Sequence, residues 1–184
     1  MNKEIEKLNR KIRNCKRCPL WKLRKNIVPG EGPANAKIMI IGQAAGFEED
    51  KTGKPFIGRA GQFLNKFLKI AKIKREKIFI TSVLKCFPPK NRKPTKEEIE
   101  TCLPYLKKQI EIINPKKFIL LGGVAFSVFF PDKKLKDFRG KWITLRQAQG
   151  KKKFFITYHP AAGLRFPKIK KILERDFKNF SKFL

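Results

Sequence analysis

Residues 37–42 read Lys-Ile-Met-Ile-Ile-Gly, a short and almost continuous apolar run that ends in glycine. Such a run is typical of a strand that is buried on both faces of a parallel sheet. Three further apolar runs follow along the chain, at residues 77–82, 118–123 and 153–157. Each of them is predicted to be a strand of the same sheet.

Segments with helical character separate these strands. Apolar residues recur at helical spacing over residues 59–71, and Thr95-Lys-Glu-Glu98 is a capping box that predicts a helix reaching residue 113. Pro104 is expected to bend that helix. Further helices are predicted at residues 3–14, 124–130 and 167–184. The alternation of strands and helices predicts an α/β domain with a mainly parallel sheet.

The length of 184 residues suits one full domain and is too short for two. No internal repeat and no domain boundary is visible, so residues 1–184 are predicted to form a single domain. Residues 19–36 are rich in proline and glycine and are expected to be an irregular connection. Residues 131–152 are expected to be a surface excursion.

The chain is strongly basic, with 45 Lys and Arg against 15 Asp and Glu and a formal net charge of +30. A nucleic acid is the natural partner, because cations that neutralise phosphates release counterions. A composition rich in Lys, Ile and Phe also fits genome bias or a thermostable surface. The 41% of hydrophobic residues supplies a packed core. No apolar stretch approaches the ~20 residues of a membrane span, so no membrane association is expected.

The four cysteines have the spacing Cys15-x2-Cys18 and Cys86-x15-Cys102. A C-x2-C pair whose partners return from a distant segment suits four thiolates around one metal centre. Zinc and a [4Fe-4S] cluster both accept this set, and the irregular spacing favours iron–sulfur; unrelated buried thiols are the remaining alternative. The charged N-terminus has no secretory signal, so we expect a reducing, cytoplasmic or intracellular compartment.

The unusual residues of the chain follow the predicted strands, and the carboxyl ends of parallel strands meet at one crevice. They lie at Gly42–Gly46, Ser82–Cys86, Gly122–Gly123 and Tyr158–Gly163. A glycine-rich turn after a first strand also suits a nucleotide phosphate. The sequence lacks both G-x-x-x-x-G-K-[ST] and G-x-G-x-x-G, which disfavours a nucleotide cofactor.

Five ordered motifs and the cysteine spacing cover nearly the whole chain. The motifs are Val28-Pro-Gly-Glu-Gly-Pro33, Gly42-Gln-Ala-Ala-Gly46, Glu48-Glu-Asp-Lys-Thr-Gly-Lys-Pro-Phe-Ile-Gly-Arg-Ala-Gly61, Lys85-Cys-Phe-Pro-Pro89 and His159-Pro-Ala-Ala162. With Cys15-x2-Cys18-Pro-Leu, this combination resembles the iron–sulfur (family 4, thermophile-type) uracil-DNA glycosylases. The resemblance implies a three-layer α/β/α fold with a short, mainly parallel central sheet, and a structural [4Fe-4S] cluster. It further implies hydrolysis of the N-glycosidic bond of uracil in single- or double-stranded DNA.

The resemblance also implies roles for individual residues. Phe56 would stack on the extruded base, His159 would donate to its O2 atom, and peptide N–H groups of the turn that contains Ala44 would add to this donation. Leu164 and Arg165 would enter the duplex. Phosphate contacts are expected from Arg59, Lys85 and Arg165. The cluster ligands would be Cys15, Cys18, Cys86 and Cys102. A monomer is expected, and a sliding-clamp contact is left open.

Two positions depart from the family pattern. Gln43 stands where the family has Glu; a neutral amide cannot deprotonate water, although it can position one. Any acid–base role would pass to Glu48, Glu49 or Asp50, or be absent. Ser82 stands where the family has an Asn that reads the uracil edge, and losing that pairing weakens discrimination. Two alternatives therefore stay open: a glycosylase for hypoxanthine or xanthine, and a non-catalytic iron–sulfur DNA-binding module.

Overall fold

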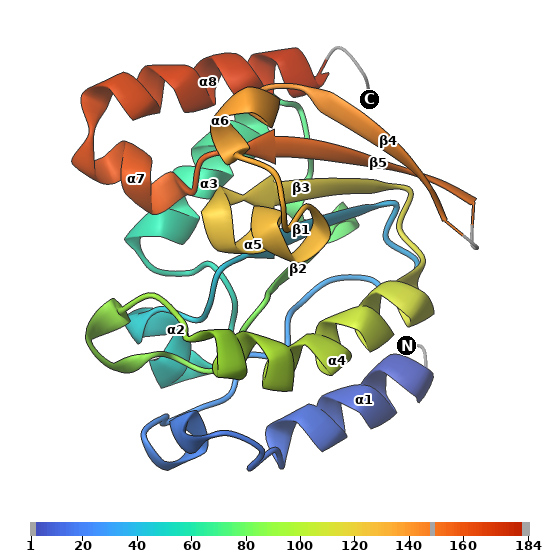
Figure 1. The fold of residues 1–184 in the computed structure, drawn as a ribbon, viewed down its shortest axis with the longest axis vertical. Helices are drawn as coiled ribbons and strands as arrows, with labels where there is room; N and C mark the ends of the chain where they lie inside the picture. Colours follow the sequence, from blue (N-terminus) through green and yellow to red (C-terminus); the bar gives the residue numbers. More distant parts are fainter. Residues whose placement is uncertain (1–2, 148–149, 182–184) are drawn as a thin grey trace.

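The computed structural model describes residues 3–147 and 150–181 and contains one five-stranded sheet (Figure 1). The strands are β1 (Ile38–Gly42), β2 (Phe79–Ser82), β3 (Lys117–Leu121), β4 (Trp142–Gln147) and β5 (Gly150–Thr157). They lie in the order β2-β1-β3-β5-β4. All neighbours are parallel except β4, which pairs antiparallel with β5 at the edge. The predicted mainly parallel sheet is confirmed.

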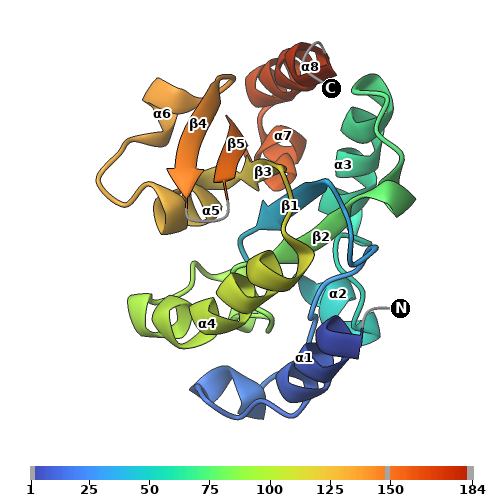
Figure 2. The same cartoon turned by 90° about the vertical axis from the view of Figure 1, so that its right-hand side faces the viewer.

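Helices cover both faces of the sheet (Figures 1 and 2). One face carries α1 (Lys3–Arg13), α4 (Lys96–Ile113), α5 (Gly122–Phe129) and α6 (Leu135–Phe138). The other carries α3 (Arg59–Ile70) and α8 (Pro167–Ser181), with α7 (Pro160–Arg165) packed on both. The short elements are α2 (Phe47–Thr52), η1 (Pro19–Lys22), η2 (Arg75–Lys77) and η3 (Pro89–Asn91). The three-layer α/β/α architecture is therefore confirmed.

Alternation along the central strands explains the two layers of core. Phe118 and Leu120 face the cluster that contains α4 and α5, whereas Ile119 and Leu121 face the cluster that contains α3 and α8. All four side chains are buried. A strand with apolar residues on both faces must be covered on both faces, which is what the continuous apolar runs predicted.

Most predicted helices are observed within one or two residues of their expected ends. The capping box is present, since the Thr95 side chain accepts from the Glu98 N–H and the Glu98 side chain accepts from the Thr95 N–H. Pro104 lies inside α4. The helix predicted over 167–184 is described as far as Ser181, and residues 182–184 of that prediction lie outside the described residues.

The prediction of a surface excursion at residues 131–152 is wrong. This segment contains α6, the edge strand β4 and the first residues of β5. Trp142 of β4 packs on Phe155 and Phe180, at centroid distances of 5.4 and 5.0 Å. Apolar and polar residues alternate over residues 143–146, which is the pattern of a half-exposed edge strand, but this stretch is short and the surrounding lysines concealed it.

Two short helices were also missed. Helix α2 lies between the first predicted strand and the helix predicted at 59–71, where no helix was predicted; it has Gly46 at its N-cap, three acidic residues in its first turn and Gly53 at its C-cap with φ 73°. These are ordinary helix start and stop signals. Helix α7 follows His159, with Pro160 at its first position. Among the described residues, no helix combines the length and the apolar character that a membrane crossing requires.

Candidate active site

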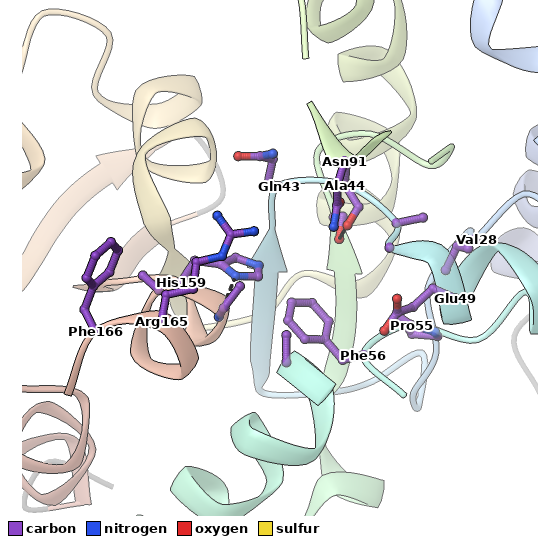
Figure 3. A pocket seen from close by; sticks show the side chains of 16 residues that line it. Val28, Gln43, Ala44, Glu49, Pro55, Phe56, Asn91, His159, Arg165 and Phe166 are labelled. Atoms are coloured by element: carbon purple, nitrogen blue, oxygen red, sulfur yellow. Dashed lines mark hydrogen bonds between the residues drawn. The ribbon is translucent and has the colours of Figure 1, made fainter. Parts of the chain in front are cut away.

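A pocket of about 300 Å³ lies at the carboxyl ends of β1, β2 and β5 (Figure 3). It is the crevice that the strand-end motifs predicted. Several predicted site residues line it together: Gln43, Ala44, Glu49, Phe56, Ser82, His159 and Arg165. A pocket of this size that is lined by both polar and apolar groups is typical of a small-molecule site.

Phe56 is held in the pocket by its backbone and by its neighbours. Its φ of 52° is in the left-handed region, which is unusual for a bulky residue and indicates a constrained position. A Cβ at Gly42 would lie 2.6 Å from the Phe56 ring, and one at Gly61 would lie 1.9 Å from its carbonyl oxygen. Both glycines are therefore needed for the ring to occupy this place.

Arg75 and Glu49 fix the loop on either side of that ring. The Arg75 Nη2 donates to the Pro55 carbonyl at 2.7 Å. The Glu49 carboxylate accepts from the N–H groups of Ile57 and Gly58, at 2.9 and 3.0 Å. Glu49 thus positions the loop that carries Phe56, a structural contribution that the sequence did not predict; its predicted catalytic role stays a prediction.

His159 lies at the N-cap of α7 and faces Phe56, with ring centroids 5.7 Å apart and an interplanar angle of 30° (Figure 3). Its Nδ1 accepts from the Ala161 N–H at 3.2 Å. Burial lowers the pKa of His159 from its ordinary value of 6.5 to about 4. The imidazole is therefore neutral at pH 7, and because Nδ1 is an acceptor, its one proton is on Nε2.

Gly122 allows the close approach of the His159 loop to the sheet. It has φ 85°, and a Cβ there would lie 3.0 Å from the His159 Cβ. Gly122, at the end of the third predicted strand, therefore lies next to the His-Pro motif, as predicted. Its backbone conformation is one that residues with side chains rarely adopt.

The structure contradicts the predicted phosphate contact of Lys85. This side chain is fully buried. Its Nζ donates to Thr81 Oγ1, the Ser82 carbonyl and Gln109 Oε1, at 2.6, 2.7 and 2.7 Å. Burial lowers the pKa of Lys85 to about 7. A lysine in a loop is usually exposed, and nothing in the sequence around Lys85 indicates that this side chain is buried.

The other predicted DNA contacts lie at the surface. Arg165 lines the pocket on the side of His159 (Figure 3). Leu164 is 41% exposed, which is high for a leucine and leaves it free to contact a partner. Arg59 is exposed at the start of α3 but does not line the pocket. Their predicted roles on DNA stay predictions.

Sequence reasoning missed several residues of the pocket wall. Phe166 follows Arg165 and is 56% exposed, and Asn91 reaches the pocket from the η3 turn. Val28 and Pro55 complete the apolar part of the wall. A Pro-Pro pair such as Pro88-Pro89 is typical of a turn, but a turn signal does not reveal where the side chains of the turn point.

All four cysteines line one small cavity beside the N-terminal half of α4. They are free of disulfides. The Arg24 Nη1 donates to Cys86 Sγ at 3.1 Å, and its Nη2 donates to the Cys15 carbonyl at 2.8 Å. Among the described residues, no group of three or more His, Cys, Asp or Glu side chains has metal-site geometry. The four predicted ligands thus lie around one cavity, but their side chains are not arranged as they would be around a metal ion.

Burial raises the pKa of the Cys86 thiol to about 11, and it also raises the pKa of Cys102. A buried thiol of this kind stays protonated unless a cation stabilises the thiolate. A cavity shared by all four sulfur-bearing side chains and an arginine directed at one sulfur atom are compatible with a sulfur-ligated metal group.

Fold and pocket together define an α/β protein in which a mainly parallel sheet carries an aromatic ring and a buried histidine in one pocket at the carboxyl ends of its strands. Residues 29–183 match the family model described as the uracil DNA glycosylase superfamily, and the chain belongs to this family. It is similar to the type-4 uracil-DNA glycosylase of Pyrobaculum aerophilum, with 43% identity over 96% of this chain and 93% of the relative. The type-4 enzyme of Saccharolobus solfataricus is 46% identical over 94% of this chain and 83% of its own. That of Thermotoga maritima is 39% identical, over 98% and 94%.

Proposed function

We propose that the protein is a DNA glycosylase that removes uracil by hydrolysing its N-glycosidic bond and leaves an abasic site. The observation that carries this proposal is the meeting of Phe56 and His159 in one pocket, with ring centroids 5.7 Å apart. Membership of the uracil DNA glycosylase superfamily supports it. The formal charge of +30 supports DNA as the partner, because binding to phosphates releases counterions.

The base must first leave the helical stack, a step that costs a few kcal/mol. The buried ring of Phe56 offers a rigid face on which an extruded pyrimidine stacks. A ring fixed by two glycines and a left-handed backbone loses little conformational entropy when the base binds. Phe56 thus binds and orients the base, and the exposed Leu164 and Arg165 are placed to fill the gap in the DNA.

Cleavage breaks the bond between sugar C1′ and base N1, and the electron pair moves to the base. Negative charge therefore grows on uracil O2, and a donor directed at that atom lowers the barrier. The Nε2–H of His159 is that donor. A neutral imidazole has one N–H, and the contact of its Nδ1 with the Ala161 N–H keeps that proton on Nε2, where it can point at O2.

The reaction is completed when a water oxygen bonds to C1′ and loses a proton. Gln43 lines the pocket and can orient this water through its amide. Glu49 also lines the pocket, and Gly46 lies so close to its carboxylate that a Cβ there would be 2.4 Å from Oε2. Glu49 is the carboxylate best placed to accept the proton, although one of its oxygens already binds two backbone N–H groups.

We infer that Cys15, Cys18, Cys86 and Cys102 hold a [4Fe-4S] cluster, with zinc as the disfavoured occupant. When bound, such a cluster crosslinks the N-terminal segment to the loop after β2 and the first turns of α4. Arg24 adds a hydrogen bond to one sulfur, which stabilises the thiolate. We also infer that the protein acts as a monomer inside the cell; a sliding-clamp contact stays a prediction.

Ser82 favours a second candidate function, in which the excised base is hypoxanthine or xanthine. This residue lines the pocket but supplies only one hydroxyl. The test is to incubate the protein with oligonucleotides that carry uracil, hypoxanthine, xanthine or only normal bases, and then to break abasic sites in alkali. We expect strand breaks at uracil. Breaks only at a purine would favour the second candidate, and no break with any substrate would leave a DNA-binding module.

A further inference from the structure

Asn91 is a pocket residue that the proposed chemistry does not use. It belongs to the η3 turn after β2 and lines the same pocket as Phe56 and His159. In Figure 3 it lies across the pocket from His159, with Phe56 below and between them. Its carboxamide carries a donor group and an acceptor on one plane, so it can pair with two adjacent polar groups of a ligand.

The backbone of this turn is strained. Lys90 has φ 53° and Asn91 has φ 60°, so two successive residues with side chains adopt the left-handed conformation. Each such residue costs on the order of 1 kcal/mol, although Asn tolerates the region better than most. A conformation of this cost persists only where its surroundings enforce it, and such positions cluster at functional sites.

The turn is enforced from both sides. The Asn91 N–H donates to the Pro88 carbonyl at 3.0 Å, and the Arg92 N–H donates to the Pro89 carbonyl at 3.2 Å. The Arg92 guanidinium then binds both carboxylate oxygens of Glu98, at 2.9 and 2.6 Å. Glu98 is itself part of the capping box of α4. The turn that carries Asn91 is therefore attached to the rigid end of a long helix.

Ser82 cannot supply the missing base recognition alone. Its hydroxyl is directed at the Ala44 carbonyl, at 3.5 Å, and its short side chain lies at the floor of the pocket beside Gly42. The edge of uracil opposite the sugar presents a donor, N3–H, beside an acceptor, O4. A hydroxyl that donates to the Ala44 carbonyl can only accept from N3–H, whereas a carboxamide can pair with both groups in one plane.

We propose that the Asn91 carboxamide recognises the N3–H and O4 edge of the extruded uracil and so determines base specificity. The amide oxygen accepts from N3–H and the amide nitrogen donates to O4, while His159 donates to O2 on the other side of the ring. This inference rests on the proposed function. It adds a specificity-determining residue that comes from a loop rather than from the end of a strand.

The test uses Asn91→Gly, because glycine adopts the left-handed conformation readily and removes only the amide. The matched control is Lys90→Gly, which changes the adjacent residue of the same strained turn and keeps the amide. We expect Asn91→Gly to lower the single-turnover rate of uracil excision by roughly 10- to 100-fold, the range set by one bidentate amide contact. Lys90→Gly should stay within about threefold of the wild type.

Two further readouts separate base recognition from a merely structural role. Free uracil should inhibit Asn91→Gly at least about 10 times more weakly than wild type, whereas affinity for undamaged DNA should be unchanged. Asn91→Asp should lower the ratio of uracil to cytosine excision by about 10-fold or more, because a carboxylate repels O4 and accepts from the cytosine amino group.

The outcomes distinguish this inference from the proposed function. If the wild type excises uracil and Asn91→Gly retains its rate and its inhibition by uracil, this inference is overturned and the proposed function stands. If the wild type excises only hypoxanthine or xanthine, recognition of uracil by Asn91 is overturned. If the wild type excises no base, the proposed function and this inference fall together.

Discussion

The proposed chemistry requires His159 to be neutral at pH 7, with its proton on Nε2, and this protonation state can be measured directly. Burial lowers its pKa to about 4, and the Ala161 N–H occupies Nδ1. Because His159 is the only histidine of the chain, its imidazole signals in an NMR spectrum of labelled protein need no assignment. We expect a titration midpoint near pH 4, with the proton on Nε2 above it.

The same pKa has a consequence for stability. The unfolded chain takes up the His159 proton near pH 6.5, whereas the folded protein resists it down to about pH 4. Stability is therefore lost as the pH falls between these values, by about 3 kcal/mol in total for 2.5 pKa units. The His159→Ala variant lacks this contribution, so its unfolding free energy should depend less on pH in this window.

The assay compares urea unfolding of wild type and His159→Ala at pH 7 and pH 4, so that all other titrating groups cancel in the difference. The rate of base excision should also show no inflection near pH 6.5. An imidazole that titrates near pH 6.5, or a proton on Nδ1 at pH 7, would refute the role of a neutral His159 as the donor to O2.

Three further predictions test the fold around the site. Gly42→Ala places a Cβ 2.6 Å from the ring of the stacking phenylalanine and should lower the rate of uracil excision by about 100-fold. Gly123→Ala places a Cβ in open space and should leave the rate unchanged. Equal rates for the two variants would contradict the claim that the position of the phenylalanine ring matters. Asp176→Ala removes a buried carboxylate that accepts from a threonine and an arginine, and should lower the free energy of unfolding in urea by about 3 kcal/mol. The control Asp132→Ala, at an exposed position, should leave that free energy almost unchanged. A similarly small loss for Asp176→Ala would show that the network is dispensable. Cys102→Ser should lose the iron and sulfide found in anaerobically purified wild type; zinc in the wild type would contradict the cluster.

The sheet and the location of the pocket could be predicted because they depend on strong local patterns. Buried parallel strands appear as continuous apolar runs, and the carboxyl ends of such strands must meet at one edge. The motifs after 37–42 and 153–157 were therefore placed together correctly. The edge strand Trp142–Gln147 was not predicted, because its apolar residues are few, are divided between the two faces of the sheet and are followed by charged residues.

Burial of single polar side chains could not be predicted from the sequence. Lys85 is one of 45 cationic residues, and only the packing of Thr81 and Gln109 around it shows that it is buried. The left-handed backbone of Asn91 likewise lies next to a contact between Arg92 and Glu98 that the sequence does not reveal. Both depend on contacts that only the folded chain brings together.

The most direct measurement of the central claim is the release of free uracil from a uracil-containing oligonucleotide in a single turnover, by wild type and by His159→Ala. Removing one preorganised donor from such a site costs about 100- to 1000-fold in rate. We expect a loss of that size, with salt-dependent DNA affinity unchanged. Equal rates for the two proteins would contradict the assignment of His159 as the donor to the departing base.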